Sequence, residues 1–122
     1  MAKSSSTART SLNPLLHVFM ETLIASVRSD TTDLSARQLA VFLKVYLEPD
    51  TDHTVRGLAA VLNISKPAIT RALDRLGKFD FIKRETDPHD RRSVIARRTQ
   101  AGSAYLRTLN GYLNEASKQA NM

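Results

Sequence analysis

Apolar residues recur with a helical period along most of the chain and predict five helices. Side chains spaced i, i+3, i+4 and i+7 line one face of a helix. The predicted helices cover residues 14–29, 36–47, 54–62, 65–78 and 100–118. After Phe81 the period changes, and residues 82–86 and 93–99 are typical of two short strands. The pattern therefore predicts a mainly α fold with a small two-stranded β hairpin.

Residues that can cap a helix stand where these helices begin. Asn13 before Pro14 is typical of a helix start, since the side chain can accept a free backbone N–H and proline suits the first turn. Ser35 with Gln38 forms a capping-box pattern. Further predicted caps are Thr54, Ser65 and Thr99, and Asn63 tolerates the left-handed conformation that ends a helix.

The two short helices within residues 54–78 are separated by only about three residues, so they must cross at a large angle as a helix-turn-helix. The hairpin of residues 82–99 has strong turn chemistry in Asp87–Asp90 and must pack on the preceding helices to be stable. We expect a single winged helix-turn-helix domain over residues 12–122, preceded by a flexible N-terminal tail of residues 1–11.

The helices over 12–30 and 100–118 indicate dimerisation. The first is apolar around more of its circumference than a one-sided stripe, as Leu15, Phe19 and Leu23 illustrate. Wrapping such a helix entirely within its own domain is the alternative, and it is hard to sustain in a chain of 122 residues. We therefore expect a homodimer.

The formal net charge of +6 is concentrated in residues 56–107, which hold 12 Lys and Arg against 5 Asp and Glu. Such clustering favours a polyanionic partner, which could be DNA, RNA or an acidic membrane surface. The chain has no cysteine, which excludes disulfides and thiol chemistry. It has no apolar run of membrane-spanning length and no secretory signal, so we expect a cytoplasmic, nucleoid-associated protein without a membrane partner.

The outward face of the predicted helix 65–78 carries the first group of candidate DNA contacts. The major groove admits one helix, and its base edges offer acceptors to Arg and Lys and a methyl group to Thr. An ordinary solvated face, with Asp74 among the cations, is the alternative for an isolated helix. The helix-turn before it and the basic hairpin after it favour DNA, and the predicted contacts are Ser65, Lys66, Pro67, Thr70, Arg71 and Arg75, with Arg56 on the preceding helix.

The hairpin supplies the second group. It carries Lys83, Arg84, Arg91, Arg92, Arg97 and Arg98 within sixteen residues. Arginines on a protruding turn suit a narrow minor groove, and Asp90 can hold a neighbouring guanidinium in one rotamer. A merely solubilising turn is the alternative. The predicted contacts here are Asp90, Arg91 and Arg92.

No catalytic constellation is evident. His17, His53 and His89 lie in separate predicted elements without metal-ligand spacing, and the four glycines form no phosphate-binding loop. We expect no enzyme activity, metal or cofactor. Sequence-specific regulation is the leading hypothesis; a non-specific architectural or RNA-associated module and a protein-interaction module are the alternatives.

Residues 35–110 resemble the MarR family of bacterial winged-helix regulators. The likeness is carried by "LSARQLAVF", "VRGLAAVLNISKPAITRALDRL", "DPHDRRS" and the Thr99–Gly102 pattern. The resemblance implies a homodimer that binds a near-palindromic double-stranded DNA operator, usually as a repressor. It places Ser65, Lys66, Thr70 and Arg71 on the recognition helix and Arg91 and Arg92, braced by Asp90, in the minor groove. It also implies a small-molecule effector for many members.

Overall fold

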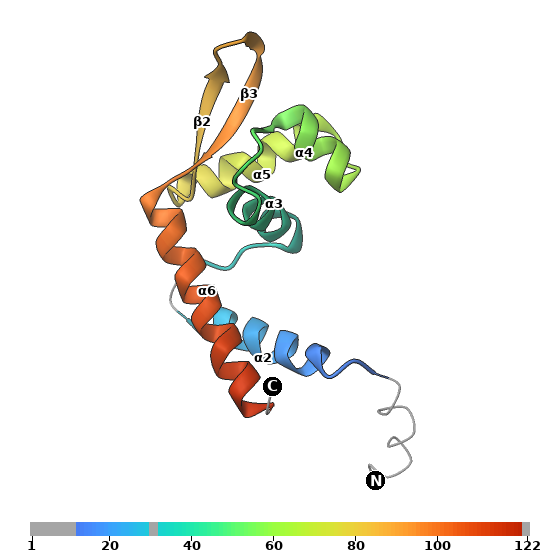
Figure 1. The fold of residues 1–122 in the computed structure, drawn as a ribbon, viewed down its shortest axis with the longest axis vertical. Coiled ribbons are helices and arrows are strands. Elements are labelled where there is room, and N and C mark those ends of the chain that lie inside the picture. The colour runs from blue at the N-terminus through green and yellow to red at the C-terminus, as the bar shows by residue number, and fades with distance from the viewer. Residues whose placement is uncertain (1–11, 30–31, 121–122) are drawn as a thin grey trace. The chain divides into compact units, whose positions relative to one another are not determined.

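A computed structural model describes residues 12–29 and 32–120, so the predicted flexible tail, residues 1–11, lies outside the described residues. The order of elements is that of a winged helix, as Figure 1 shows: α2 (Leu15–Arg28), α3 (Ala36–Leu47), β1 (His53–Thr54), α4 (Val55–Leu62), α5 (Lys66–Lys78), β2 (Ile82–Asp87), β3 (Asp90–Arg98) and α6 (Gln100–Gln119). The chain divides into two compact units. Residues 32–107 form the winged-helix unit, and the described residues 12–29 and 108–120 belong to the helical unit.

The winged-helix unit has a closely packed core. Aromatic side chains lie at its centre: the Phe42 ring stacks on Tyr46 with centroids 4.4 Å apart and meets Tyr105 edge-on at 5.2 Å. Tyr105 in turn stacks on Phe81 at 4.5 Å. The largest fully buried side chains are Val41, Phe42, Leu58, Ile69, Leu73, Leu76 and Ile95. Three of these, Ile69, Leu73 and Leu76, form the buried face of the helix 65–78, opposite the face predicted to point outward.

The predicted caps are present. Ser35 and Gln38 form the reciprocal capping box of α3, and the side chains of Thr54 and Ser65 accept backbone N–H groups at the starts of α4 and α5. The Asn13 side chain accepts the Leu15 N–H at 2.9 Å, although α2 begins one residue later than predicted. Asn63 ends α4 with φ 55°, in the left-handed region. These local interactions fix the helix boundaries.

The sheet has three strands rather than the predicted two, in the order β1-β3-β2. The missed strand, β1, is only two residues long and pairs His53 with Ala96 and Thr54 with Ile95. No alternation can be recognised in two residues, so the sequence pattern gave no sign of it. The strand β3 also begins at Asp90, three residues before the predicted start.

A hydrogen-bonded junction fixes the start of α6 on the winged-helix unit. The Tyr46 hydroxyl donates to the Phe81 carbonyl at 2.7 Å and accepts the Thr99 N–H at 2.9 Å. The Thr99 hydroxyl donates to the Asp80 carbonyl and accepts the Gly102 N–H. A Cβ atom at Gly102 would overlap the Tyr46 hydroxyl. Only glycine therefore fits the first turn of α6 at this point.

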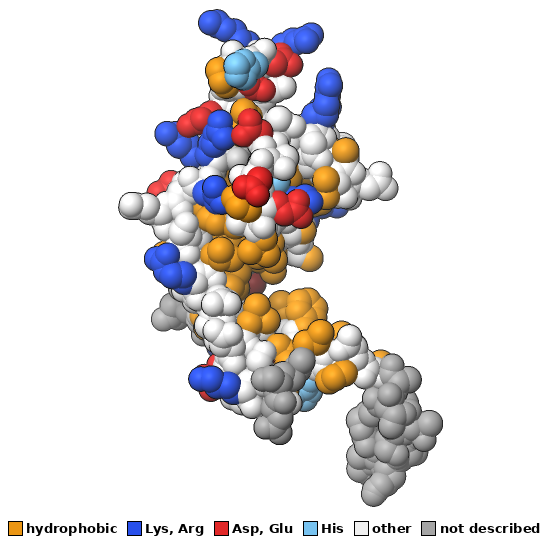
Figure 2. Space-filling model, viewed as in Figure 1, with side chains coloured by type: hydrophobic (Ala, Val, Ile, Leu, Met, Phe, Trp, Pro, Cys, Tyr) orange, Lys and Arg blue, Asp and Glu red, His pale blue; other side chains and the backbone are white. Residues whose placement is uncertain are grey.

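The helical unit contrasts with this packing. In α2 only Val18 and Thr22 are buried, and the Thr22 hydroxyl donates to the Val18 carbonyl at 2.8 Å. Hydrophobic side chains are visible along α2 in Figure 2, and the large exposed ones are Leu15, Leu16, Phe19, Met20, Leu23, Ile24 and Val27. Within the described ranges, no helix has the length and apolar character needed to cross a membrane.

Candidate nucleic-acid interface

The helix α5 presents a polar face opposite its buried one. Its N-cap Ser65 accepts the Ala68 N–H at 3.2 Å, and Pro67 stands in the first turn. The buried side chains of this helix are Ala68, Ile69, Ala72, Leu73 and Leu76, and the opposite side of the helix faces outward. All six of the predicted contacts at this helix are exposed: Ser65, Lys66, Pro67, Thr70, Arg71 and Arg75.

Arg71 has a cationic neighbour that the sequence reasoning missed. It lines a surface depression of about 350 Å³ together with Arg37 and Ser35, from the start of α3. The helix dipole disfavours a positive charge in the first turn of a helix. Arg37 in the first turn of α3 was therefore a sequence signal for a binding role. Arg37 and Arg71 together place two positive charges along this depression.

Arg75 and Asp74, the next residues on α5, are held by contacts within the protein. The Arg75 guanidinium lies over the Phe79 ring, 4.9 Å from its centroid. The Asp74 carboxylate forms an ion pair with the Arg84 guanidinium of β2, with 2.8 Å between the two atoms. Arg75 therefore lies at the margin of the exposed face, and Asp74 connects the helix to the hairpin.

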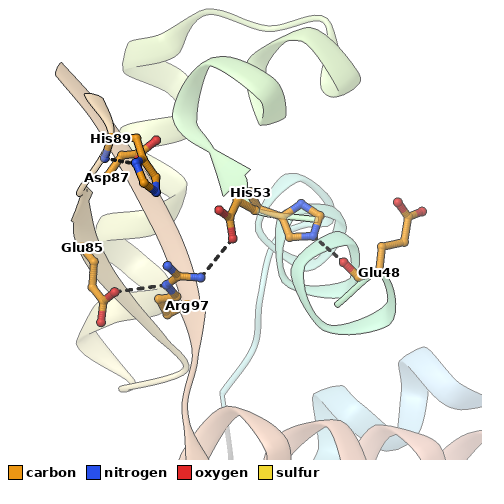
Figure 3. Close-up of polar contacts among 7 residues, drawn as sticks. Glu48, His53, Glu85, Asp87, His89 and Arg97 are labelled. Carbon is orange, nitrogen blue, oxygen red and sulfur yellow. Dashed lines mark hydrogen bonds and ion pairs between the residues drawn. The ribbon is translucent and has the colours of Figure 1, made fainter. Parts of the chain in front are cut away.

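The lower part of the hairpin, here called the wing stem (Lys83, Arg84, Glu85 and Arg97), is a set of ion pairs. Arg97 lies between two carboxylates, 3.1 Å from Glu85 and 3.1 Å from Asp52, and Figure 3 shows its contact with Glu85. Its hydrogen bond to Glu85, followed by the charge of Asp52, raises the pKa of Arg97. Lys83 also faces Glu85, at 3.9 Å. All three stem cations therefore have carboxylate partners within the protein.

The turn at the end of the hairpin, here called the wing tip (residues 87–92), is arranged differently. The Asp90 carboxylate accepts the Arg92 backbone N–H at 3.1 Å and the Arg92 Nε–H at 3.4 Å. These hydrogen bonds, the backbone one foremost, hold the pKa of Asp90 below its usual range, and the charge of Arg56 on α4 adds to this. The Arg92 side chain is still 93% exposed. Cationic side chains project from this tip in Figure 2.

The structure thus groups the predicted site residues in two places. Ser65, Lys66, Thr70 and Arg71 share the outward face of α5, and Arg91 is exposed at the wing tip beside Asp90 and Arg92. Arg56 belongs to the second group through its interaction with Asp90. The six hairpin cations are not equivalent, since Arg84 and Arg97 are used internally.

The histidines form no second site within the described residues. His53 is buried in β1, and its Nε2–H donates to the Glu48 carbonyl at 2.7 Å, as Figure 3 shows. His17 lies 3.9 Å from Glu21 on α2. Across residues 12–29 and 32–120, no cluster of His, Asp and Glu is arranged to hold a metal ion.

The sequence of this chain matches one protein family, and its fold resembles that of several known structures. The sequence model of the MarR family matches residues 34–94. Transcriptional regulator Tm0710 from Thermotoga maritima is similar in structure, with a TM-score of 0.71 and 19% identity over 86% of this chain and 70% of that one. MarR itself gives a TM-score of 0.62 and 25% identity over 86% of this chain and 72% of its own.

A third similar structure, PefR from Streptococcus agalactiae, is described as a heme sensor protein in complex with heme. It gives a TM-score of 0.67 and 21% identity over 98% of this chain and 79% of that one. No curated protein sequence matches this chain significantly.

Proposed function

Because this chain belongs to the MarR family, we propose that it is a dimeric transcriptional repressor that binds double-stranded DNA. The observation that carries the proposal is the uneven pairing of its positive charges. Among the described residues, Arg84 and Arg97 have carboxylate partners at 2.8 and 3.1 Å, whereas Lys66, Arg71 and Arg91 have no such ion pair. A cation without a carboxylate partner can use all of its donors to bind phosphate oxygens and base edges.

The recognition step is assigned to α5. Arg71 can donate two parallel hydrogen bonds to a guanine, and the Thr70 methyl can contact a thymine. Ser65 and Lys66 stand at the start of the helix, where phosphate groups are attracted by the free N–H groups and the helix dipole. The charge of Arg37 beside Arg71 supports a further phosphate contact from α3. The outward face of α5 would therefore occupy the major groove.

The wing tip is assigned to the minor groove. Its narrow form concentrates negative potential, which favours an inserted guanidinium. Arg92 is suited to insertion because Asp90 restrains its side chain while leaving it 93% exposed. Arg91 and Arg56 add positive charge nearby. Arg92→Ala is expected to weaken DNA binding without unfolding the domain.

The dimer is assigned to the helical unit. Monomeric proteins rarely leave a continuous row of large apolar side chains in water, and α2 leaves seven. A two-fold dimer would present two copies of α5 to half-sites separated by about one turn of DNA, roughly 34 Å, which requires a near-palindromic operator. The small-molecule effector expected from the family resemblance stays a prediction.

The test compares a duplex recovered by selection from a random pool with a random duplex, both fluorescently labelled, by anisotropy. A specific regulator should bind the selected duplex about 10³-fold or more tightly than random DNA. Arg71→Ala should cost about 1–3 kcal/mol on the selected duplex and relax the preference at one base pair per half-site. Arg28→Ala, which removes the same charge from α2, is the matched control and should leave affinity nearly unchanged.

Two other results would contradict the proposal. Equal affinity for all duplexes, or preference for RNA, would indicate a non-specific architectural or RNA-associated module. Absence of binding to any nucleic acid at low salt would indicate a protein-interaction module, because phosphate contacts alone give measurable affinity under such conditions.

A further inference from the structure

The ion pair between Asp74 and Arg84 is difficult to explain by stability alone. Its two side chains are 56% and 38% exposed, and the contact is 2.8 Å. Exposed ion pairs contribute little to folding, because water screens them and ordering two side chains costs entropy. The reason for so close an ion pair must therefore be sought in what this surface of the protein binds.

Asp74 occupies a position that opposes the proposed function. It follows Thr70 by four residues and Arg71 by three, so its side chain lies on the same face of α5 as both. A free carboxylate there would face the DNA phosphates that Lys66 and Arg71 approach. Like charges brought together as water is excluded are strongly unfavourable.

Arg84 removes that charge from the surface. It lies in β2 and pairs across the sheet with Ala96, whereas its neighbour Lys83 pairs with Arg97. Successive strand residues point to opposite faces, so Arg84 and Lys83 face opposite sides of the hairpin. Only the side carrying Arg84 faces the carboxylate of α5; the other side holds the Glu85–Arg97–Asp52 ion pairs.

We propose that Arg84 is a positioning residue for DNA binding that acts through Asp74, as the internal counter-ion that neutralises this carboxylate on the recognition face. It does not itself contact DNA. The proposal rests on the DNA-binding function proposed above and adds that one hairpin arginine is used to neutralise the protein's own charge.

A double-mutant cycle on the full chain tests it, with a fluorescein-labelled mixed-sequence duplex of about 30 base pairs at low salt. Arg84→Ala should lower affinity about tenfold, because Asp74 then faces phosphate unpaired. Asp74→Asn should leave affinity unchanged or raise it. In the double variant, Asp74→Asn should restore the affinity that Arg84→Ala removes, to within about threefold. Arg84→Lys should retain most of the wild-type affinity.

Lys83→Ala is the matched control, since it removes one positive charge from the adjacent residue on the opposite side of the hairpin. Its effect should be small and should not depend on Asp74. Urea unfolding of all variants should give the same midpoint, which separates a binding effect from a folding one.

Two outcomes would overturn the inference. If Arg84 contacts phosphate directly, Arg84→Ala will weaken binding equally with Asp or Asn at position 74, and the salt dependence will fall by about one ion per site. If the bridge acts only as an anchor for the hairpin, Asp74→Asn alone will weaken binding as much as Arg84→Ala does. Failure of the wild-type chain to bind any duplex would instead contradict the proposed function itself.

Discussion

The two units of this chain handle apolar surface in opposite ways. In the winged-helix unit, residues from α3, α5 and the sheet fill one core, and Phe42, Ile69 and Leu76 are fully buried. In the helical unit, α2 buries Val18 and Thr22 but leaves most of its large side chains exposed. A unit that fills its own core is stabilised by its own contacts. A unit with exposed apolar side chains depends on a partner to bury them.

Polar groups follow the same division. The winged-helix unit has long-range hydrogen bonds, such as those of Tyr46 to Phe81 and Thr99, and ion pairs that join α5 and the loop before β1 to the hairpin. At the start of α2 and within it, the side-chain hydrogen bonds of Asn13 and Thr22 reach only two and four residues along the chain. Hydrogen bonds and ion pairs between residues distant in sequence therefore hold together the part of the molecule proposed to bind DNA.

The largest effect is expected from a substitution that disrupts the packing of the winged-helix unit. Gly102→Ala forces the Tyr46 hydroxyl from its place and disrupts its hydrogen bonds to Phe81 and Thr99. Overpacking and buried polar groups left unpaired together should lower the free energy of unfolding by roughly 3–5 kcal/mol. Urea denaturation at one fixed protein concentration measures it.

Gly111 on the same helix provides the control. A Cβ atom there meets nothing within 4 Å. Gly111→Ala should therefore raise stability by up to about 1 kcal/mol, because alanine favours the helix. Equal changes in stability from Gly102→Ala and Gly111→Ala would contradict the difference in packing between the winged-helix unit and the helical unit.

The next largest effect is expected on dimerisation through the helical unit. Phe19 is 56% exposed, and a dimer that buries its remaining surface gains roughly 1 kcal/mol from each copy. Phe19→Ala should then weaken dimerisation by about 2 kcal/mol, or roughly 30-fold, in analytical ultracentrifugation. Val61 on α4 is similarly exposed at 58%, and Val61→Ala should leave the dimer unchanged. A chain that is monomeric before substitution would exclude the proposed dimer.

A smaller effect is expected from removing the N-cap of α3. Ser35→Ala removes the oxygen that accepts the Gln38 N–H, and it should cost about 1 kcal/mol of unfolding free energy. Ser35→Asp retains a capping oxygen and should remain close to wild type in the same denaturation experiment. If both variants lose equal stability, the cap does not hold the start of α3.

The smallest effect is a pH dependence at the wing tip. The backbone N–H of Arg92 is the main cause that lowers the pKa of Asp90 in the folded chain. The resulting stabilisation is present above the ordinary aspartate pKa of about 3.9 and is lost as the pH falls through the lower folded value. Carboxyl carbon NMR should show Asp90 titrating at lower pH in the folded chain than in urea. Identical curves would mean that the Asp90–Arg92 contact is absent in solution.

The features that were predicted from the sequence are those set by neighbouring residues. The capping box of Ser35 and Gln38, the end of α4 at Asn63 and the buried stripe of α5 each depend on side chains within a few positions of one another. Such interactions leave a readable pattern, and they placed all five described helices. The outward face of α5 followed directly from them.

The features that were missed depend on partners distant in sequence. The strand β1 exists because His53 pairs with Ala96, and Arg97 is held by Asp52, which lies 45 positions away. The charge of a hairpin arginine is visible in the sequence, but its partner is decided by folding. Counting cations therefore overstated the charge that the wing offers to DNA.

The exposed apolar row along α2 has a consequence for regulation. If two copies must meet through it before two recognition helices can bind an operator together, occupancy rises with the square of the monomer concentration when monomers predominate. A modest change in expression would then switch the target gene more sharply than a monomeric binder could. The exposed apolar face of α2 would thus determine how steeply operator occupancy depends on the concentration of the protein.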